Sequence, residues 1–463
     1  MNKNTTEKTL LQLFLPVFFE YTLLMAVGVV DTIMLSTVSD QAVAASGTAN
    51  TYLYLVSMIF TIMSTGALAV MTQYIGAKHP EVAERAKTIG LLFNFGCGLL
   101  FSVLFAFGSN TILVFLNTSQ AITADAAVYM SIVGAALVFL SMTNIYSSYL
   151  RSFGHPKLTL IGSAAANIVN IILNAAFLAA GLGIKGVALA TLTARIVNLV
   201  LSIIFAERIK RKRIEKPLET RPGFPEVPMI GNTKIFRQIL KIGLPSAVEV
   251  IVFNLSISFM VKCLNQMDPE GIAIGVYSYC NQICNLIYCV AVSLSQANGI
   301  IVGWRVGEGR FEACYRETMK AVKYGIAVTA LAAVLSAFAG KTLLGILTDN
   351  QLILGFVSMI MIINIVKEIG RAGNYIISMA LRTSGDAAIT VIMGLVTMPL
   401  GAFLGSYVLG IKYGMGVYGA WIGMTLDEGL RCLWMYARFR SRKWMSKVLV
   451  HAQEADTYNS VVQ

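Results

Sequence analysis

Two carboxylates lie inside the first long apolar run of the sequence. Glu20 follows Pro16 by four positions, and Asp31 follows Glu20 by eleven. At about 100° per residue, eleven positions make three helical turns with about 20° of drift, so both side chains would share one helix face. A carboxylate in hydrocarbon without a partner takes up a proton or holds a cation. The pair therefore predicts a site whose charge changes by one unit when a proton or small cation binds.

The same pattern occurs again in the second half of the chain. Leu244, Pro245 and Glu249 lie 229 positions after Leu15, Pro16 and Glu20. Further matches at offsets of 231 to 233 pair Gly76, Glu81 and Arg85 with Gly307, Glu312 and Arg316, Leu150-Arg151 and Gly154 with Leu381-Arg382 and Gly385, and Gly183 and Gly186 with Gly416 and Gly419. Matches in one order at nearly one offset indicate an internal duplication. The repeat partner of Asp31 is Met260, so the halves are expected to differ in function.

Other polar residues interrupt the apolar runs at helical spacing. Asn167, Asn170 and Asn174 recur three and four positions apart, and Thr191 or Thr193 could add a hydroxyl to the same site. Single asparagines of this kind also serve as hydrogen bonds between helices, and that interpretation stays open.

The second half carries its own polar groups. Asn281, Asn285 and Tyr288 are spaced as one helix face that could line a cavity. Glu368 and Arg371, next to Lys367, can pair on one face as a transport site or as a structural ion pair. We expect Asp427, Glu428 and Arg431 to form a structural charge cluster.

The composition predicts the class of protein. Hydrophobic residues make up 56% of the 463 residues, charged residues 13%, and the mean hydropathy is +0.70. A soluble chain carries about 25% charged residues, and apolar stretches of 18 residues or more recur here, each able to cross about 30 Å of hydrocarbon. We therefore predict an all-α polytopic membrane protein.

The apolar runs can be assigned to twelve spans. They cover residues 10–35, 50–75, 88–108, 126–150, 158–180, 186–206, 238–262, 272–302, 318–340, 352–380, 387–411 and 416–437. This predicts an N-terminal six-helix half (1–206), a basic, proline-rich linker (207–237), a C-terminal six-helix half (238–440) and a tail (441–463). Because six is even, both halves enter the bilayer from the same side, so they should be related by a pseudo-twofold axis along the membrane normal, with a cleft between them.

The positive charges predict the orientation. Of the 36 lysines and arginines, 28 fall in segments on the side of the N-terminus, four in segments on the other side and four in spans. This split predicts that both termini are cytoplasmic, in the plasma membrane. The +12 net charge is then mainly a topology signal, and we expect no nucleic-acid partner.

The motifs together resemble the multidrug and toxic compound extrusion (MATE) family over nearly the whole chain. The resemblance rests on the early Leu-Pro with Val30-Asp31-Thr32-Ile33-Met34, on Gln73-Tyr74-Ile75-Gly76, on Leu150-Arg151 before Gly154, on Leu381-Arg382 before Gly385-Asp386, and on Arg438-Phe439-Arg440-Ser441 with Trp444. It implies a secondary-active exporter of organic cations and drug-like compounds. The exporter would be driven by protons or sodium ions and need no other cofactor.

The resemblance also implies roles for single residues. Asp31 matches the aspartate of the family's N-terminal cation site, to which residues like Asn170 and Asn174 contribute, and these three are the expected Na⁺ ligands. Glu20 and Thr191 complete the expected coupling site. Some members carry an aspartate where Asn174 stands, so this site has fewer formal charges. The resemblance makes Glu249 a candidate for binding substrate or coupling ion. From their spacing in the second half, Glu368, Asn281, Asn285 and Tyr288 are expected to join it, although the cluster around Glu368 departs from branches of the family that carry an isolated aspartate there.

Three other classes of membrane protein fit the sequence less well. A lipid-linked oligosaccharide flippase of the same superfamily would need a more cationic cavity for pyrophosphate. A membrane enzyme would need a nucleophile and base or a metal site at membrane depth, and all three histidines fall in predicted loops or the tail. A channel is less consistent with a repeat of proline-containing helices with acids. We expect a monomer that works by alternating access, with cationic or amphipathic small molecules as substrates.

Overall fold

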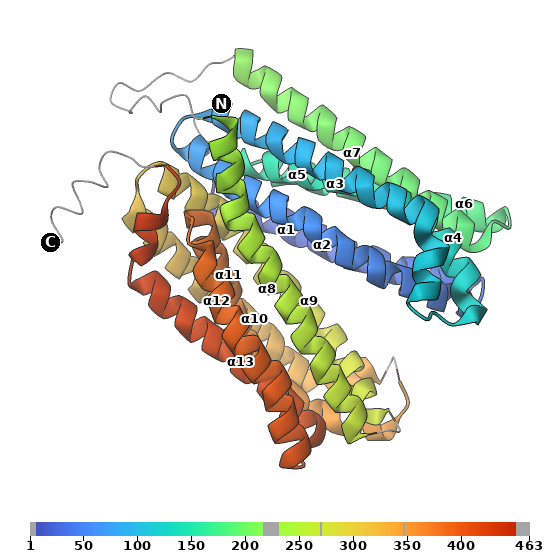
Figure 1. Ribbon diagram of the computed structural model, residues 1–463. Coiled ribbons are helices and arrows are strands. Elements are labelled where there is room, and N and C mark those ends of the chain that lie inside the picture. Colours follow the sequence, from blue (N-terminus) through green and yellow to red (C-terminus); the bar gives the residue numbers. More distant parts are fainter. Residues whose placement is uncertain (1–5, 216–230, 269–270, 346–347, 451–463) are drawn as a thin grey trace. The chain divides into compact units, whose positions relative to one another are not determined.

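The computed structural model describes residues 6–215, 231–268, 271–345 and 348–450 (Figure 1). The chain divides into two compact units, Met1–Gly243 (unit 1) and Leu244–Gln463 (unit 2). The described residues are helical almost throughout. This follows from the long apolar runs, because in hydrocarbon a backbone must form its hydrogen bonds within the helix.

Unit 1 begins with a helix that holds both N-terminal carboxylates. Thr9 caps it in a capping box with Gln12, and Pro16 lies inside it. The helices are α1 (Leu10–Ser36), α2 (Asp40–Gly76), α3 (Pro80–Phe115), α4 (Gln120–Ala135), α5 (Leu137–Ser152), α6 (Pro156–Ala179), α7 (Gly183–Glu215) and the first turns of α8 (Asn232–Met267). Those first turns pack closely on α2, since a methyl group on Gly66 would lie 2.2 Å from the Ile239 carbonyl oxygen.

Unit 2 repeats this order, except that one helix, α11, stands where unit 1 has α4 and α5, and a π-helix follows α12. It contains the rest of α8, α9 (Ile272–Gly307), α10 (Phe311–Leu344), α11 (Gln351–Ser384), α12 (Ala387–Met398), the π-helix η1 (Pro399–Lys412), α13 (Gly416–Arg440) and the short 3₁₀-helix η2 (Lys443–Lys447). Glycines bring η1 close to α13, because a methyl group on Gly401 would lie 2.5 Å from Cβ of Asp427. This packing places the charged residues of α13 against α11 and η1.

One expected span of unit 1 is broken in the middle. The axes of α4 and α5 differ by 42° across Ala136. The break frees carbonyl groups at the end of α4, and the Val133 oxygen accepts hydrogen bonds from the Ala136 amide at 3.2 Å and from Arg195 Nη1 at 3.0 Å. A cation at a helix C-terminus also interacts favourably with the helix dipole. Arg195 of α7 therefore stabilises the break.

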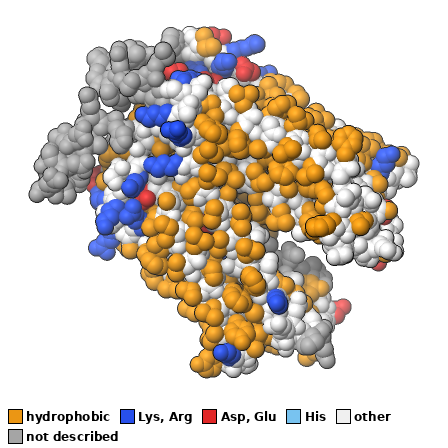
Figure 2. Space-filling model, viewed as in Figure 1, with side chains coloured by type: hydrophobic (Ala, Val, Ile, Leu, Met, Phe, Trp, Pro, Cys, Tyr) orange, Lys and Arg blue, Asp and Glu red, His pale blue; other side chains and the backbone are white. Residues whose placement is uncertain are grey.

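The helices have the length and surface of membrane spans. Ten described helices are long and apolar enough to cross a bilayer, or eleven when α4 and α5 count as one span. Figure 2 shows hydrophobic side chains along the helices of both units. Most of the lysines and arginines in this view lie toward one end of the helices in each unit. The predicted all-α polytopic fold is confirmed, whereas the number of twelve spans and the symmetry axis stay predictions. α13 is the twelfth expected span, and it carries three buried charged residues, Asp427, Glu428 and Arg431.

The expected segment boundaries differ from the helices at two places. Residues 207–215 of the expected linker continue α7, and 232–237 belong to α8, while 216–230 lie outside the described residues. The start of the expected tail is ordered on unit 2: Trp444 is fully buried, stacks on Phe439 and donates from Nε1 to the Phe439 carbonyl at 3.0 Å. The rest of the tail, 451–463, lies outside the described residues.

Candidate functional site

Asp31 lies against the asparagine stripe of α6. Asn174 Nδ2 donates to Asp31 Oδ1 at 2.7 Å and lies 3.4 Å from Asn170 Oδ1, and Asn170 Nδ2 lies 3.5 Å from Thr191 Oγ1 of α7. Asn174 is fully buried, and its Oδ1 has no hydrogen-bond partner. The four predicted residues therefore form one polar cluster, and a buried oxygen without a donor is a ready ligand for a cation.

The cluster continues through residues that sequence reasoning did not assign. Tyr129 of α4 hydrogen-bonds to Thr191 and to Asn50 of α2, with 3.3 Å between its hydroxyl oxygen and Asn50 Nδ2, and it interacts electrostatically with Asp31 and Arg195. Arg195 is the residue that caps the broken span. A polar path therefore joins the Asp31 cluster to the break between α4 and α5.

Glu20 lies on the same face of α1 as Asp31 and also meets α6, but its environment is different. Arg151 Nη2 donates to Glu20 Oε2 at 2.8 Å, Thr159 Oγ1 donates to the same oxygen at 2.9 Å, and Ser163 Oγ donates to Oε1 at 3.4 Å. The carboxylate is buried and its charge is compensated. Glu20 was predicted as part of the coupling site with Asp31, and the structure places it with Arg151 rather than with the asparagines.

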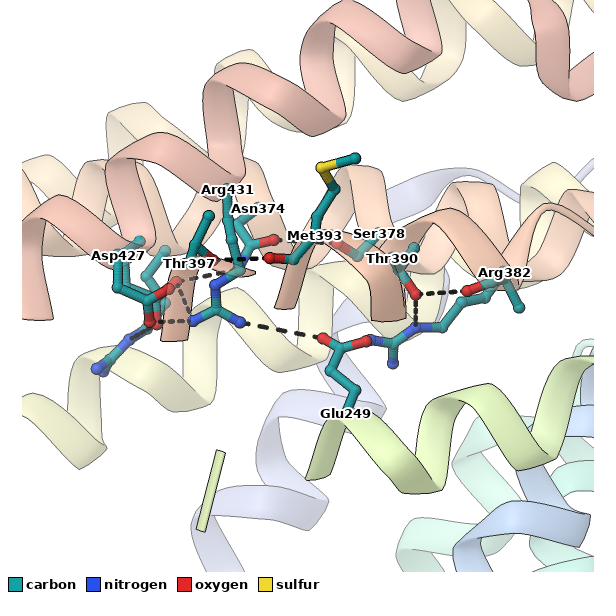
Figure 3. Close-up of polar contacts among 12 residues, drawn as sticks. Glu249, Asn374, Ser378, Arg382, Thr390, Met393, Thr397, Asp427 and Arg431 are labelled. Atoms are coloured by element: carbon teal, nitrogen blue, oxygen red, sulfur yellow. Dashed lines mark hydrogen bonds and ion pairs between the residues drawn. The ribbon is translucent and has the colours of Figure 1, made fainter. Parts of the chain in front are cut away.

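Glu249, the repeat partner of Glu20 in unit 2, forms the same kind of ion pair (Figure 3). Arg382 Nη2 donates to Glu249 Oε2 at 2.5 Å, and Arg382 Nε lies 3.4 Å from Thr390 Oγ1. Arg382 and Thr390 follow Arg151 and Thr159 by 231 positions, so each half pairs its repeat glutamate with its repeat arginine. Gly394 stands where unit 1 has Ser163, and there Arg431 Nη1 approaches Glu249 Oε1 to 4.0 Å.

Glu368 belongs to a buried charge network, which comprises Lys367, Glu368, Arg371, Asp427, Glu428 and Arg431. Arg371 bridges α11 to α13, at 3.1 Å from Glu368 and 3.3 Å from Glu428. Lys367 is 1% exposed, and its Nζ lies 3.6 Å from Glu368 and 4.6 Å from the centre of the Trp421 ring. The ion pair expected of Glu368 and Arg371 is present, within a larger network than expected.

The remaining predicted residues lie on α9. Asn281, Asn285 and Tyr288 are each partly exposed, and the Tyr288 ring packs edge-on against Tyr375, with 5.2 Å between ring centres. Arg371 lies 5.8 Å from the centre of the Tyr288 ring. Tyr288 therefore adjoins the charge network.

Arg151 and Arg382 are the residues whose role sequence reasoning missed. The sequence shows each of them as part of a repeated Leu-Arg motif, but not as the partner of a glutamate. The signal was present, since both the Pro-Glu and the Leu-Arg motifs repeat at nearly one offset and each would bury a charge of opposite sign.

The comparisons with known proteins agree with the internal repeat. The MatE family model matches twice, over residues 16–176 and again over 245–407. The chain is 31% identical over 453 residues to a protein named uncharacterized transporter YisQ of Bacillus subtilis, covering 96% of this chain and 97% of the relative. It is 23% identical to a probable multidrug resistance protein NorM of Thermotoga maritima, covering 96% and 94%.

Solved structures share the fold. An outward-facing multidrug resistance MATE family transporter of the MOP superfamily superposes with a TM-score of 0.83 at 18% identity, covering 95% of this chain and 98% of the other. A MOP superfamily transporter from Pyrococcus furiosus gives a TM-score of 0.83 at 17% identity, covering 96% of each chain. With two family matches, a full-length relative and the same fold, this chain belongs to the MatE family, the multidrug and toxic compound extrusion family of membrane transporters.

Proposed function

We propose that the chain is a secondary-active multidrug antiporter of the plasma membrane, which exports organic cations and drug-like compounds in exchange for H⁺ or Na⁺. It works as a monomer with both termini in the cytoplasm. The names of its relatives, among them several probable multidrug resistance proteins, support the substrate class. The charge distribution along the sequence supports the orientation.

The environment of Asp31 carries the proposal. The two repeat glutamates and the three carboxylates of the charge network all lie within 4.0 Å of an arginine or lysine nitrogen, whereas Asp31 forms no ion pair within the described part of the chain. A carboxylate at membrane depth without a fixed counter-charge gains most from a mobile one. Asp31 is therefore the coupling residue, and its charge alternates as the ion binds and leaves.

The neighbouring amides and hydroxyl have the chemistry for either ion. For Na⁺, oxygens of Asp31, Asn170, Asn174 and Thr191 would be the ligands, because hard cations prefer oxygen. For H⁺, Asp31 alone carries the ion and the amides orient its carboxyl group. Glu249, Glu368, Asn281, Asn285 and Tyr288 are the proposed substrate residues of unit 2, where the paired carboxylates supply negative charge and the aromatic ring supplies a face for a cation.

The test is transport in proteoliposomes with the H⁺ and Na⁺ gradients imposed separately and ethidium as the probe. Asp31→Asn is expected to reduce gradient-driven efflux to the level of protein-free liposomes under both gradients, because the amide cannot change charge. Asp125→Asn removes a carboxylate of α4 that likewise forms no ion pair with the residues the structure describes. It is the matched control and should transport as the wild type does.

A second substitution separates the two ions. If Na⁺ is the coupling ion, Asn174→Ala removes a ligand and should raise the Na⁺ concentration needed for half-maximal transport. If H⁺ is the coupling ion, the same variant should shift the pH dependence of the transport rate, and the rate should not depend on the Na⁺ concentration. Gradient-driven efflux that persists in Asp31→Asn at the wild-type rate would refute the proposed coupling residue.

A further inference from the structure

Four basic residues of unit 1 meet where α1, α6 and α7 come together. Lys8 precedes α1, His155 precedes α6, Lys157 lies in the first turn of α6, and Lys212 lies in the last turn of α7. His155 interacts electrostatically with Lys8 and Lys212, and Lys8 interacts with Lys157. We call these four residues the basic cluster.

The basic cluster has no anion of its own within the described residues. None of its members forms an ion pair there, and Lys8 Nζ donates instead to the carbonyl oxygen of Gly154. Burial, together with the charge of Lys157, lowers the pKa of Lys8. Burial, Lys8 and Lys212 lower the pKa of His155 to about 4. Lys8 is partly buried and Lys157 and Lys212 are exposed. Positive groups that repel one another in this way gain from an anion placed between them.

Unit 2 has an acidic residue at the position equivalent to His155. Gly154 and Gly385 are repeat partners at an offset of 231, and the next residue is His155 in unit 1 but Asp386 in unit 2. Asp386 is buried, and its Oδ2 accepts a hydrogen bond from Arg438 Nε at 2.8 Å. Unit 2 thus supplies a carboxylate at the position where unit 1 supplies a histidine among lysines.

Exposed apolar side chains continue from the basic cluster along two packed helices. On α1, Leu11 and Leu15 follow Lys8 by three and seven positions and are 61% and 42% exposed. On α6, Ile161 and Ile168 follow Lys157 by four and eleven positions and are 52% and 58% exposed. On α6 this spacing puts Lys157, Ile161 and Ile168 on one helix face, and on α1 Leu11 and Leu15, four positions apart, share a face that begins just after Lys8. A ligand that is anionic at one end and apolar along its length matches this pattern.

We propose that the basic cluster binds the phosphate group of an anionic phospholipid, whose acyl chains lie along the exposed apolar residues of α1 and α6. Lys8, Lys157 and Lys212 supply charge, and their long apolar stems let the ammonium groups reach the level of the headgroups. The phosphate takes the place that Asp386 holds in unit 2. Bound lipid then ties the start of α1 to the ends of α6 and α7.

The experiment measures the apparent Tm of the full-length protein in detergent with phosphatidylglycerol, with phosphatidylcholine or with inorganic phosphate added. Phosphatidylglycerol should raise the Tm of the wild type by a few degrees above phosphatidylcholine, because a ligand that binds only the folded state stabilises it. His155→Asp should remove that difference and raise the Tm in phosphatidylcholine, since it gives the basic cluster its own carboxylate.

Two further variants complete the design. Lys8→Gln/Lys212→Gln should reduce the phosphatidylglycerol effect by at least half, and Lys157→Gln provides the same test if the double variant does not fold. Lys341→Gln, an exposed lysine at the end of α10, is the matched control and should keep the full effect. Equal Tm values in the two lipids, or a His155→Asp variant that keeps the wild-type difference, would overturn the proposal. An equal effect of inorganic phosphate would show that the ligand is a free anion and not a lipid.

Discussion

Glu20 and Glu249 each form a buried ion pair with an arginine that lies more than a hundred residues away in the sequence. In such a pair the attraction offsets the loss of hydration, but one partner left alone is a buried charge without compensation. The threonine hydroxyls at Glu20 and at Arg382 add hydrogen bonds to the pairs. These pairs therefore hold the first helix of each half to later helices.

A double-mutant cycle tests this role in unit 1. Glu20→Gln or Arg151→Gln alone is expected to cost about 3–5 kcal/mol of unfolding free energy, and the double variant clearly less than the sum. The measurement is chemical denaturation in mixed micelles. Arg310→Gln, which breaks an ion pair whose arginine side chain is 58% exposed, should cost less than about 1 kcal/mol. Additive single effects at Glu20 and Arg151 would show that the two side chains do not act as a pair.

His155 makes a separate prediction about pH. Its folded-state pKa of about 4 lies below the ordinary value of 6.5, because of burial and of Lys8 and Lys212. Between these values the unfolded chain binds more protons than the folded one, so stability should fall as the pH falls from 6.5 toward 4. His155→Gln cannot titrate and should lose less Tm over this window. A parallel decline in both proteins would assign the acid sensitivity to other groups.

Among the helices, the break between α4 and α5 has the most direct structural cause. Arg195→Gln keeps a polar side chain but removes the charge at the end of α4. We expect faster hydrogen exchange of the amides around Ala136, because the Val133 carbonyl loses its charged donor. Arg208→Gln, at an exposed position later in α7, is the control. Unchanged exchange at Ala136 would mean that packing alone maintains the bend.

The helices could be predicted from apolar runs, but their irregular parts could not. Each expected span overlaps a helical segment, from 10–35 in α1 to 416–437 in α13. The break at Ala136 has no proline, and the nearby Gly134 alone does not distinguish a break from close helix packing, since a methyl group there would lie 2.4 Å from Cβ of Phe105. Pro399 in the span 387–411 signals an irregular helix, but the sequence does not show that η1 is a π-helix, because its glycine contacts to α13 are long-range.

The candidate site was predictable where it depends on periodicity. Spacing and resemblance pointed to Asp31, Asn170, Asn174 and Thr191, and the structure brings these four together. Tyr129 could not be found in this way, because its link to Thr191 and Asn50 joins three helices. The arginine partners of Glu20 and Glu249 could be predicted only by combining the repeated Pro-Glu motif with the repeated Leu-Arg motif. A hydropathy profile does not make this combination.

Across the whole molecule, the two units differ in how their buried charges are balanced. Within the charge network of unit 2 and its repeat pair, four cations (Lys367, Arg371, Arg382, Arg431) face four anions (Glu249, Glu368, Asp427, Glu428), and the buried Asp386 forms a separate ion pair with Arg438. In unit 1 Glu20 is balanced by Arg151, and Asp31 is without an ion pair in the described residues. At the repeat position of Asp31, unit 2 has Met260, which is fully buried in an apolar core.

Because Met260 cannot titrate, the proposed transport cycle has one coupling carboxylate, Asp31, and this number determines the net charge moved in each cycle. With one titrating carboxylate, one monovalent ion enters for each monovalent organic cation that leaves, so the exchange is electroneutral. A potassium diffusion potential imposed with valinomycin at equal pH and Na⁺ should then drive no ethidium movement. Each unit of pH difference should support about a tenfold accumulation ratio. Ethidium uptake that follows the imposed voltage would require a second ion, and therefore a second carrier group besides Asp31.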